Sequence, residues 1–250
     1  MRILCIIPAR YKSSRFPGKP LADICGRPMI WWVYQQCLKV QAFTKVIVAT
    51  DDDRIRKACE DWDMSCEMTS ADNLTGTDRV AEVAERIEAD LYVNVQGDEP
   101  LVSPQTIEKV LLPFTGSATD IDIVNLMAPI ENPIDICNPT VVKVITNENG
   151  FGIYLTRAAA PHPKGSVSFQ YYKQLGIYAF SRKALSFFRN YGKTKGKAKI
   201  ERIEDVEILR FIENGWNVQF LEADEPSAAV DTPQDLEKVI GLMKQQTAEH

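Results

Sequence analysis

The chain contains 250 residues, of which 45% are hydrophobic and 25% are charged, and its 29 basic and 34 acidic residues leave a formal net charge of −5. This composition excludes disordered, collagen-like and disulfide-rich miniature proteins, and the negative charge argues against non-specific binding of nucleic acid or a membrane surface. With only two histidines, His162 and His250, the sequence also argues against a His-rich zinc site and a Ser-His-Asp enzyme.

Strands and helices alternate in the first half of the chain. Residues 3–7 form an apolar run that ends at Pro8, which is typical of a strand buried on both faces. Alternation of this kind indicates βαβ units and a mainly parallel sheet. We predict further strands at 45–50 and 91–95 and helices at 29–40, 52–62, 78–88 and 106–112.

The second half has short predicted strands without long helices between them. We interpret the region of about 120–190 as an antiparallel or mixed extension that contributes dimer contacts. The basic run 193–199 is interpreted as a solvated loop rather than a phosphate-binding segment. The predicted strands are 121–127, 141–145, 152–155, 174–180 and 218–221, and the predicted helices are 203–214, which stops at Gly215, and 232–243, with Pro233 in its first turn.

The domain number and the cellular compartment are inferred from the absence of repeats, linkers, paired cysteines and long apolar runs. At roughly 150 residues per domain, the length corresponds to about 1.7 domains, but no internal repeat or linker is visible, so we expect one continuous domain over 1–250. The six cysteines form no Cys-x-x-Cys pair and are expected to be reduced. No signal peptide and no run of about 18 apolar residues is present. We therefore expect a cytoplasmic protein without membrane insertion.

The loop that follows the first predicted strand carries the strongest functional signal. Residues 8–20 contain four cations, Arg10, Lys12, Arg15 and Lys19, and two serines, Ser13 and Ser14. Ligands of open α/β sheets bind at the carboxyl ends of strands, and arginine, lysine and hydroxyl groups together suit a polyphosphate. The loop lacks the Walker A spacing. A basic surface loop is the alternative interpretation.

Two aspartates occupy positions that suit a divalent cation. Asp98 lies beyond the predicted strand 91–95, after Gly97, and Asp231 precedes the predicted helix 232–243. Mg²⁺ prefers one or two carboxylates together with substrate phosphates and water. The alternatives are that Asp98 is a cap or turn residue and that Asp231 is an ordinary N-cap.

A third segment, residues 68–79, opens a predicted helix. Thr77 or Asp78 is either a cap of that helix or part of a site in which the free N–H groups and Arg79 receive a base edge or an anionic substrate.

Together these segments closely resemble the 3-deoxy-manno-octulosonate (KDO) cytidylyltransferases. The matching stretches occur in the family's order from residue 6 to about 240. In one-letter code they are IIPARYKSSRFPGKPLADICGRPMI, VATDDDRI, MTSADNLTGTDR, VNVQGDEP, VVKVI, YLTRAAAP, LGIYAF and VDTPQDLEKV. The resemblance implies a single-domain α/β nucleotidyltransferase (Rossmann-like) fold, with a mostly parallel mixed sheet flanked by helices and a protruding dimerisation region.

The resemblance also implies roles for individual residues. Lys19, Arg10 and Asp98 would be catalytic, and Asp98 and Asp231 would bind Mg²⁺. The residues implied to bind CTP are Pro8, Ala9, Arg10, Ser13, Arg15, Lys19, Thr69, Ala71 and Thr77; those implied to face the sugar acid are Arg79, Gln96, Arg157, Gln174, Tyr178 and Glu207.

The implied reaction converts CTP and KDO to CMP-KDO and pyrophosphate. The CMP-KDO would supply lipopolysaccharide or capsule synthesis, and the enzyme would be a homodimer. Two positions depart from the family pattern: Gln174 stands where a histidine is usual, and Ile208 where a glutamine is usual. Because lost hydrogen-bonding groups alter discrimination between substrates, an 8-amino analogue of KDO or another ulosonic acid remains an alternative acceptor. A non-catalytic nucleotide-binding partner is the alternative of another class.

Overall fold

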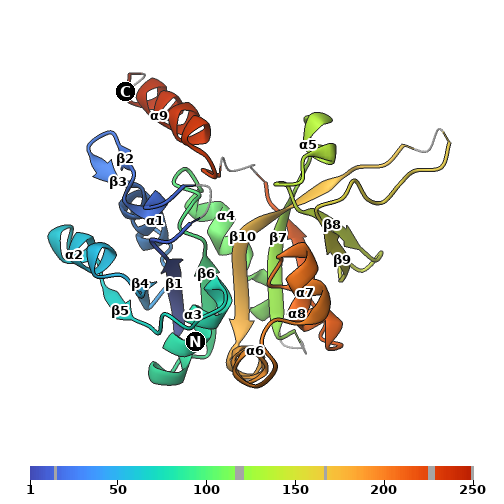
Figure 1. Cartoon of the computed structure of the whole chain (residues 1–250), viewed down its shortest axis with the longest axis horizontal. Helices are drawn as coiled ribbons and strands as arrows, with labels where there is room; N and C mark the ends of the chain where they lie inside the picture. Colours follow the sequence, from blue (N-terminus) through green and yellow to red (C-terminus); the bar gives the residue numbers. More distant parts are fainter. Residues whose placement is uncertain (14–15, 116–120, 166–167, 225–228, 249–250) are drawn as a thin grey trace.

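A mixed β-sheet forms the centre of the molecule, with helices on both faces (Figure 1). The computed structural model describes residues 1–13, 16–115, 121–165, 168–224 and 229–248. Within these residues the main sheet has the strand order β11-β7-β10-β6-β1-β4-β5, and β8 and β9 extend it beside β10. The strands are β1 (Ile3–Ala9), β4 (Lys45–Thr50), β5 (Cys66–Met68), β6 (Leu91–Val95), β7 (Ile123–Pro129), β8 (Lys143–Thr146), β9 (Gly152–Thr156), β10 (Tyr172–Ser181) and β11 (Gln219–Glu222), and a separate hairpin consists of β2 (Asp23–Ile24) and β3 (Arg27–Pro28).

Among the seven strands in the order β11-β7-β10-β6-β1-β4-β5, β10 runs against both of its neighbours, and the β8–β9 extension is also antiparallel. Strand β10 pairs antiparallel with β6 and β7, whereas β1 pairs parallel with β4 and β6, β4 with β5, and β7 with β11. The mostly parallel mixed sheet predicted from the sequence is therefore confirmed.

The helices divide between the two faces because the strands are apolar on both sides. On β1, Ile3, Cys5 and Ile7 join one core, and Leu4 and Ile6 join the other. The first core includes side chains of α1, α2 and α4, and the second those of α3, α6 and α8. The helices are α1 (Met29–Leu38), α2 (Asp53–Asp61), α3 (Gly76–Arg86), α4 (Pro104–Lys109), α5 (Ile134–Cys137), α6 (Arg182–Lys195), α7 (Lys199–Glu204), α8 (Leu209–Glu213) and α9 (Pro233–Ala248), with 3₁₀ turns at Lys19–Leu21 and Leu112–Phe114.

The second half corrects two sequence predictions. The helix predicted at 203–214 is two helices, α7 and α8, because Asp205 adopts the left-handed conformation (φ 50°) and interrupts it. Part of the basic run 193–199, interpreted as a solvated loop, is the last turn of α6, a helix that was not predicted. Ser181 caps α6 by accepting a hydrogen bond from the Ala184 N–H, at 3.1 Å.

The observed helix caps differ from the caps that the sequence offered at Thr77, Asp78, Asp98 and Asp231. Thr75, rather than Thr77 or Asp78, caps α3, and Ser103 caps α4. At the start of α9, Thr232 and Asp235 exchange the capping hydrogen bonds. Asp98 and Asp231 therefore cap neither of these helices.

Candidate active site

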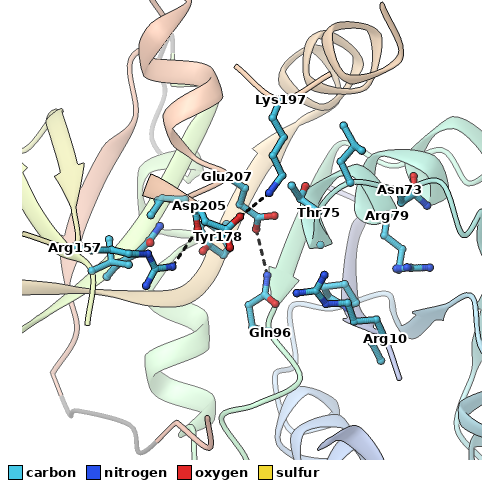
Figure 2. A pocket seen from close by; sticks show the side chains of 17 residues that line it. Arg10, Asn73, Thr75, Arg79, Gln96, Arg157, Tyr178, Lys197, Asp205 and Glu207 are labelled. Carbon is cyan, nitrogen blue, oxygen red and sulfur yellow. Dashed lines mark hydrogen bonds and ion pairs between the residues drawn. The ribbon is translucent and has the colours of Figure 1, made fainter. Parts of the chain in front are cut away.

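A cavity of about 480 Å³ lies at the carboxyl ends of β1 and β6 (Figure 2). One wall, the β1–α3 side, consists of residues 8–10, 73–76 and Arg79. The facing wall, the β10–α8 side, consists of Val142, Arg157, Gln174, Tyr178, Lys197 and residues 205–207. Gln96, which follows β6, lies between the two walls. The cavity therefore opens where the parallel strands meet the antiparallel strand β10, the kind of strand-end position at which α/β proteins bind ligands.

A second hollow of about 730 Å³ adjoins the first and shares Gln96, Val142, Gln174 and Tyr178 with it. Its wall includes both candidate metal-binding residues, Asp98 and Asp231. The Lys19 ammonium lies between them, 2.8 Å from an Asp98 carboxylate oxygen and 3.5 Å from an Asp231 oxygen. It also donates to the Val230 carbonyl at 2.9 Å. Residues 79 and 212 positions away from Lys19 in the sequence thus converge on one cation.

A slot made by two glycines holds the Gln96 side chain. A Cβ added at Gly176 would lie 2.7 Å from Gln96 Cγ, and one added at Gly76 would lie 3.0 Å from Gln96 Nε2. The Gln96 amide N–H donates to Glu207 at 3.3 Å, and the other Glu207 oxygen accepts from the Thr77 N–H at 3.0 Å. Three elements therefore fix one amide at the centre of the cavity.

A bulge in β10 turns Gln174 and Tyr178 into the cavity. Along the pairing with β7, Gln174 is opposite Met127 and Tyr178 opposite Asn125, so β10 carries extra residues between them. The buried Asn125 amide fills this irregularity by donating to the Leu175 and Ile177 carbonyls, each at 2.9 Å, and by accepting from Gln174 Nε2 at 2.8 Å. No local sequence pattern predicts this role of Asn125.

Comparison with known proteins assigns this arrangement to a family. The family model described as cytidylyltransferase matches residues 4–223. The 3-deoxy-manno-octulosonate cytidylyltransferase of Syntrophotalea carbinolica is 41% identical over 248 residues, covering 96% of this chain and 97% of the relative. The enzyme of that name from Escherichia coli is 38% identical, with 100% and 99% of the two chains covered. The chain belongs to the 3-deoxy-manno-octulosonate cytidylyltransferase family.

Solved structures agree with this assignment. A CMP:2-keto-3-deoxy-manno-octonic acid synthetase complexed with CTP superposes with a TM-score of 0.89 at 38% identity, covering 98% of this chain and 100% of the other. The inositol-1-phosphate CTP transferase from T. maritima has a TM-score of 0.67 at 15% identity and covers 98% and 95% of the two chains, which shows a shared fold alone. The nucleotidyltransferase fold expected from the sequence is thereby confirmed.

The electrostatics of this cytidylyltransferase differ between the two walls. On the β1–α3 side, burial lowers the pKa of Arg79, whose guanidinium hydrogen-bonds Thr69 and lies 3.2 Å from Asp51. On the β10–α8 side, burial raises the pKa of Glu207. Burial also raises the pKa of Tyr178, and the neighbouring Glu207, Asp98 and Glu99 add to the rise. Low dielectric therefore favours the neutral forms of two groups that face Gln96.

Arg157 faces the cavity, but the protein's own backbone uses much of its hydrogen-bonding capacity. Its Nε–H donates to the Glu204 carbonyl at 2.6 Å, its Nη1 to the Pro139 carbonyl at 3.0 Å and its Nη2 to the Asp205 carbonyl at 3.2 Å. The buried Lys143 ammonium makes three similar bonds, to the carbonyls of Asn138, Val141 and Arg157. These two cations bind the loop 138–141 to the α7–α8 junction and thus build the β10–α8 wall.

The predicted site residues are distributed unevenly over the two hollows. Pro8, Ala9, Arg10, Arg79, Gln96, Arg157, Gln174, Tyr178 and Glu207 line the first, and Asp98 and Asp231 the second. Thr69, Ala71 and Thr77 are not among the lining residues; residues 73–76 form that part of the wall. Ser13 accepts a hydrogen bond from the Phe16 N–H, and Arg15 lies outside the described residues.

Sequence reasoning missed Lys197 and Asp205 as lining residues. Lys197 belongs to the basic run 193–199, but a run of charges does not indicate which of its side chains lines a cavity.

Proposed function

We propose that this chain transfers CMP from CTP to the anomeric hydroxyl of KDO, with release of pyrophosphate. The observation that carries the proposal is the cavity itself, in which residues at the carboxyl end of β1, the α3 N-terminus, Gln96 and the β10–α8 side face one another (Figure 2). Relatives about 40% identical over nearly the whole chain are named for this reaction.

The β1–α3 side suits the nucleotide. Backbone N–H groups at a helix N-terminus and the Arg10 and Arg79 guanidiniums attract anions, and a superposable relative is a complex with CTP. Lys19 and the loop 8–20 would neutralise the triphosphate, as a lysine point charge does in other phosphate sites. The β10–α8 side would then receive the sugar acid.

Asp98 and Asp231 suit a Mg²⁺ ion as a donor set. Both present carboxylate oxygens to one cation, the Lys19 ammonium, and to the same hollow. Among the described residues, no group of three His, Cys, Asp or Glu side chains could hold a metal alone, so further ligands must come from water and substrate phosphates, as Mg²⁺ prefers. When bound, Mg²⁺ would lower the pKa of a coordinated hydroxyl and neutralise phosphate charge.

The reaction asks the protein mainly for positioning and charge neutralisation. The anomeric hydroxyl oxygen forms a bond to the α-phosphorus of CTP and loses its proton to solvent water. The bond from that phosphorus to the bridging oxygen of the leaving pyrophosphate breaks in line. Lys19 and Arg10 would stabilise the negative charge on pyrophosphate. Gln96, fixed between Gly76 and Gly176, would orient the attacking sugar.

A second acceptor deserves a test because of two carboxylates in the β10–α8 side. Asp205 and Glu207 line the cavity, and an ammonium substituent on the sugar would pair with such groups. An amino analogue of KDO is therefore the alternative substrate.

The test is pyrophosphate release from CTP and Mg²⁺ with KDO, with its 8-amino analogue and with no acceptor. Release with KDO at a higher kcat/KM than with the analogue is expected. Higher kcat/KM with the analogue would contradict the KDO assignment, and absence of release with every ulosonic acid would leave only a non-catalytic nucleotide-binding partner.

The region of about 120–190 supports the proposal of a homodimer. Its described residues include large exposed apolar side chains, Ile134 on α5 and Phe169 on the arm before β10, and this arm projects from the rest of the molecule (Figure 1). Light scattering after size-exclusion chromatography should give twice the chain mass of 28.2 kDa; a monomer at micromolar concentration would contradict it.

None of the helices in the described part of the chain is both long and apolar enough to cross a bilayer. We place the reaction in the cytoplasm as part of the same proposal, where its product would supply lipopolysaccharide or capsule synthesis.

A further inference from the structure

The β10–α8 side carries a carboxylate of its own among cations. Asp205 Oδ1 lies 2.6 Å from the Lys197 ammonium, and Arg157 Nη2 donates a hydrogen bond to the Asp205 carbonyl at 3.2 Å (Figure 2). The Lys197 hydrogen bond, with the charges of Lys197, Arg157 and Arg10, lowers the pKa of Asp205. An anionic group is therefore stabilised at this place in the cavity.

The backbone holds this carboxylate in position. Asp205 adopts a left-handed conformation at the α7–α8 junction, and Arg157 binds the carbonyls of both Glu204 and Asp205. The Asp205 side chain is 71% exposed, whereas that of Lys197 is 26% exposed. The ion pair thus joins a half-buried cation to a carboxylate that solvent or a ligand can reach.

Lys197 is the cation of the β10–α8 side whose partner is easiest to replace. The other cation of that side, Arg157, donates to the backbone carbonyls of Pro139, Glu204 and Asp205. Arg10 and Arg79 line the opposite, β1–α3 side, which suits the nucleotide. Within the described residues, Lys197 pairs with Asp205 only. An exposed ion pair is weak, on the order of 0.2–1 kcal/mol, so a better-placed carboxylate can compete for it.

We infer that Lys197 is a further substrate-binding residue and that Asp205 sets its affinity. The carboxylate of the sugar acid takes over the Lys197 ammonium from Asp205 on binding. The sugar acid rather than CTP is the ligand because Lys197 and Asp205 belong to the β10–α8 side, opposite Arg10 and Arg79 (Figure 2). This inference rests on the proposed function.

The test compares Asp205→Asn and Lys197→Met in the pyrophosphate-release assay, with KDO and CTP varied separately. Asparagine tolerates the left-handed conformation and removes only the charge. Asp205→Asn should lower the KM for KDO about two- to fivefold, because it removes a competitor of ion-pair strength. Lys197→Met should raise this KM about tenfold, because a charge-assisted hydrogen bond is lost. The KM for CTP should stay constant in both variants.

The double variant separates competition from a general change in the wall. In the Lys197→Met background, Asp205→Asn should no longer lower the KM for KDO. Asp61→Asn, which removes the partner of Lys57 in an exposed ion pair on α2, is the matched control and should change neither KM.

Three results would overturn the inference: a higher KM for KDO in Asp205→Asn, an effect confined to the KM for CTP, or no effect of either single variant. The first would favour an amino-substituted acceptor. Failure of the unmodified chain to release pyrophosphate with KDO would instead refute the proposed function, so the two failures are distinguishable.

Discussion

The two walls of the cavity are built differently. The β1–α3 side consists of short continuous segments that follow a strand or open a helix, residues 8–10 and 73–76. The β10–α8 side combines the short run 205–207 with single residues from the ends of β8 and β9, from β10 and from the segment after α6. Internal hydrogen bonds hold several of them, such as Gln174 by Asn125. The β1–α3 side presents backbone groups and cations from local segments to a ligand. The β10–α8 side can bind a ligand only after tertiary packing has brought its distant residues together.

This difference suggests a division of labour. A nucleotide is common to many transferases and suits a wall made of local motifs. Recognition of one sugar acid requires groups at fixed separations, since a site that hydrogen-bonds hydroxyls discriminates strongly only when those groups stay in place. We therefore expect variants of the two walls to separate the kinetic constants for CTP from those for the sugar.

The largest effect is expected in the second hollow, at the aspartate that contacts Lys19. Asp98→Asn should lower kcat by at least about 100-fold, because loss of one stabilising electrostatic group costs on the order of 10²–10³ in rate, and should leave the fold intact. Pyrophosphate release and the thermal midpoint measure the two parts. Turnover near normal would refute the catalytic and metal roles of Asp98; Asp224→Asn, at an ion pair with Lys109 on the surface, is the control.

Arg157→Lys tests the assembled wall. A lysine cannot reproduce the planar set of donors that binds four backbone carbonyls, so the KM for the sugar acid should rise about tenfold, equivalent to roughly 1.4 kcal/mol. The KM for CTP should change less than twofold. Equal increases in both constants would show that the two walls do not act separately.

Gly176→Ala tests the slot around Gln96. The added Cβ would meet Gln96 Cβ and Cγ at 2.8 and 2.7 Å. A change of side-chain rotamer can move Cγ, but Cβ can move only with the backbone. We expect kcat/KM for the sugar acid to fall about threefold to tenfold, a change of roughly 0.7–1.4 kcal/mol. Gly241→Ala on α9, where nothing lies within 4 Å of the added Cβ, should leave kcat/KM unchanged. Equal kcat/KM values in the two variants would exclude a positioning role for the slot.

The smallest expected effect concerns stability and pH. Burial raises the pKa of Glu207, so folding favours its protonated form. The resulting stability is fully present below the unfolded pKa of about 4.3 and is lost as pH rises through the higher folded pKa. The thermal midpoint of the unmodified chain relative to Glu207→Gln should therefore be highest near pH 4 and decline toward pH 7.5. A difference that does not vary with pH would contradict this.

Sequence patterns predicted the first half of the fold better than the second. Strands β4 and β6 have the predicted bounds, because continuous β-branched runs identify buried parallel strands. The helix α6 and the break at Asp205 were missed. A left-handed residue at an aspartate has no strong local signal, unlike one at a glycine.

The sequence by itself determined the family, the parallel core and the residues of the loop 8–20, since these depend on local order along the chain. Only the tertiary structure decided that Lys19 lies between Asp98 and Asp231, that two glycines hold Gln96, and that Lys197 and Asp205 enter the cavity. Each of these contacts depends on strand pairing or on the angle between helices. Strand pairing and helix angles are set only when the whole sheet is packed. The net charge of −5 likewise does not reveal the cations that the fold brings together in one pocket.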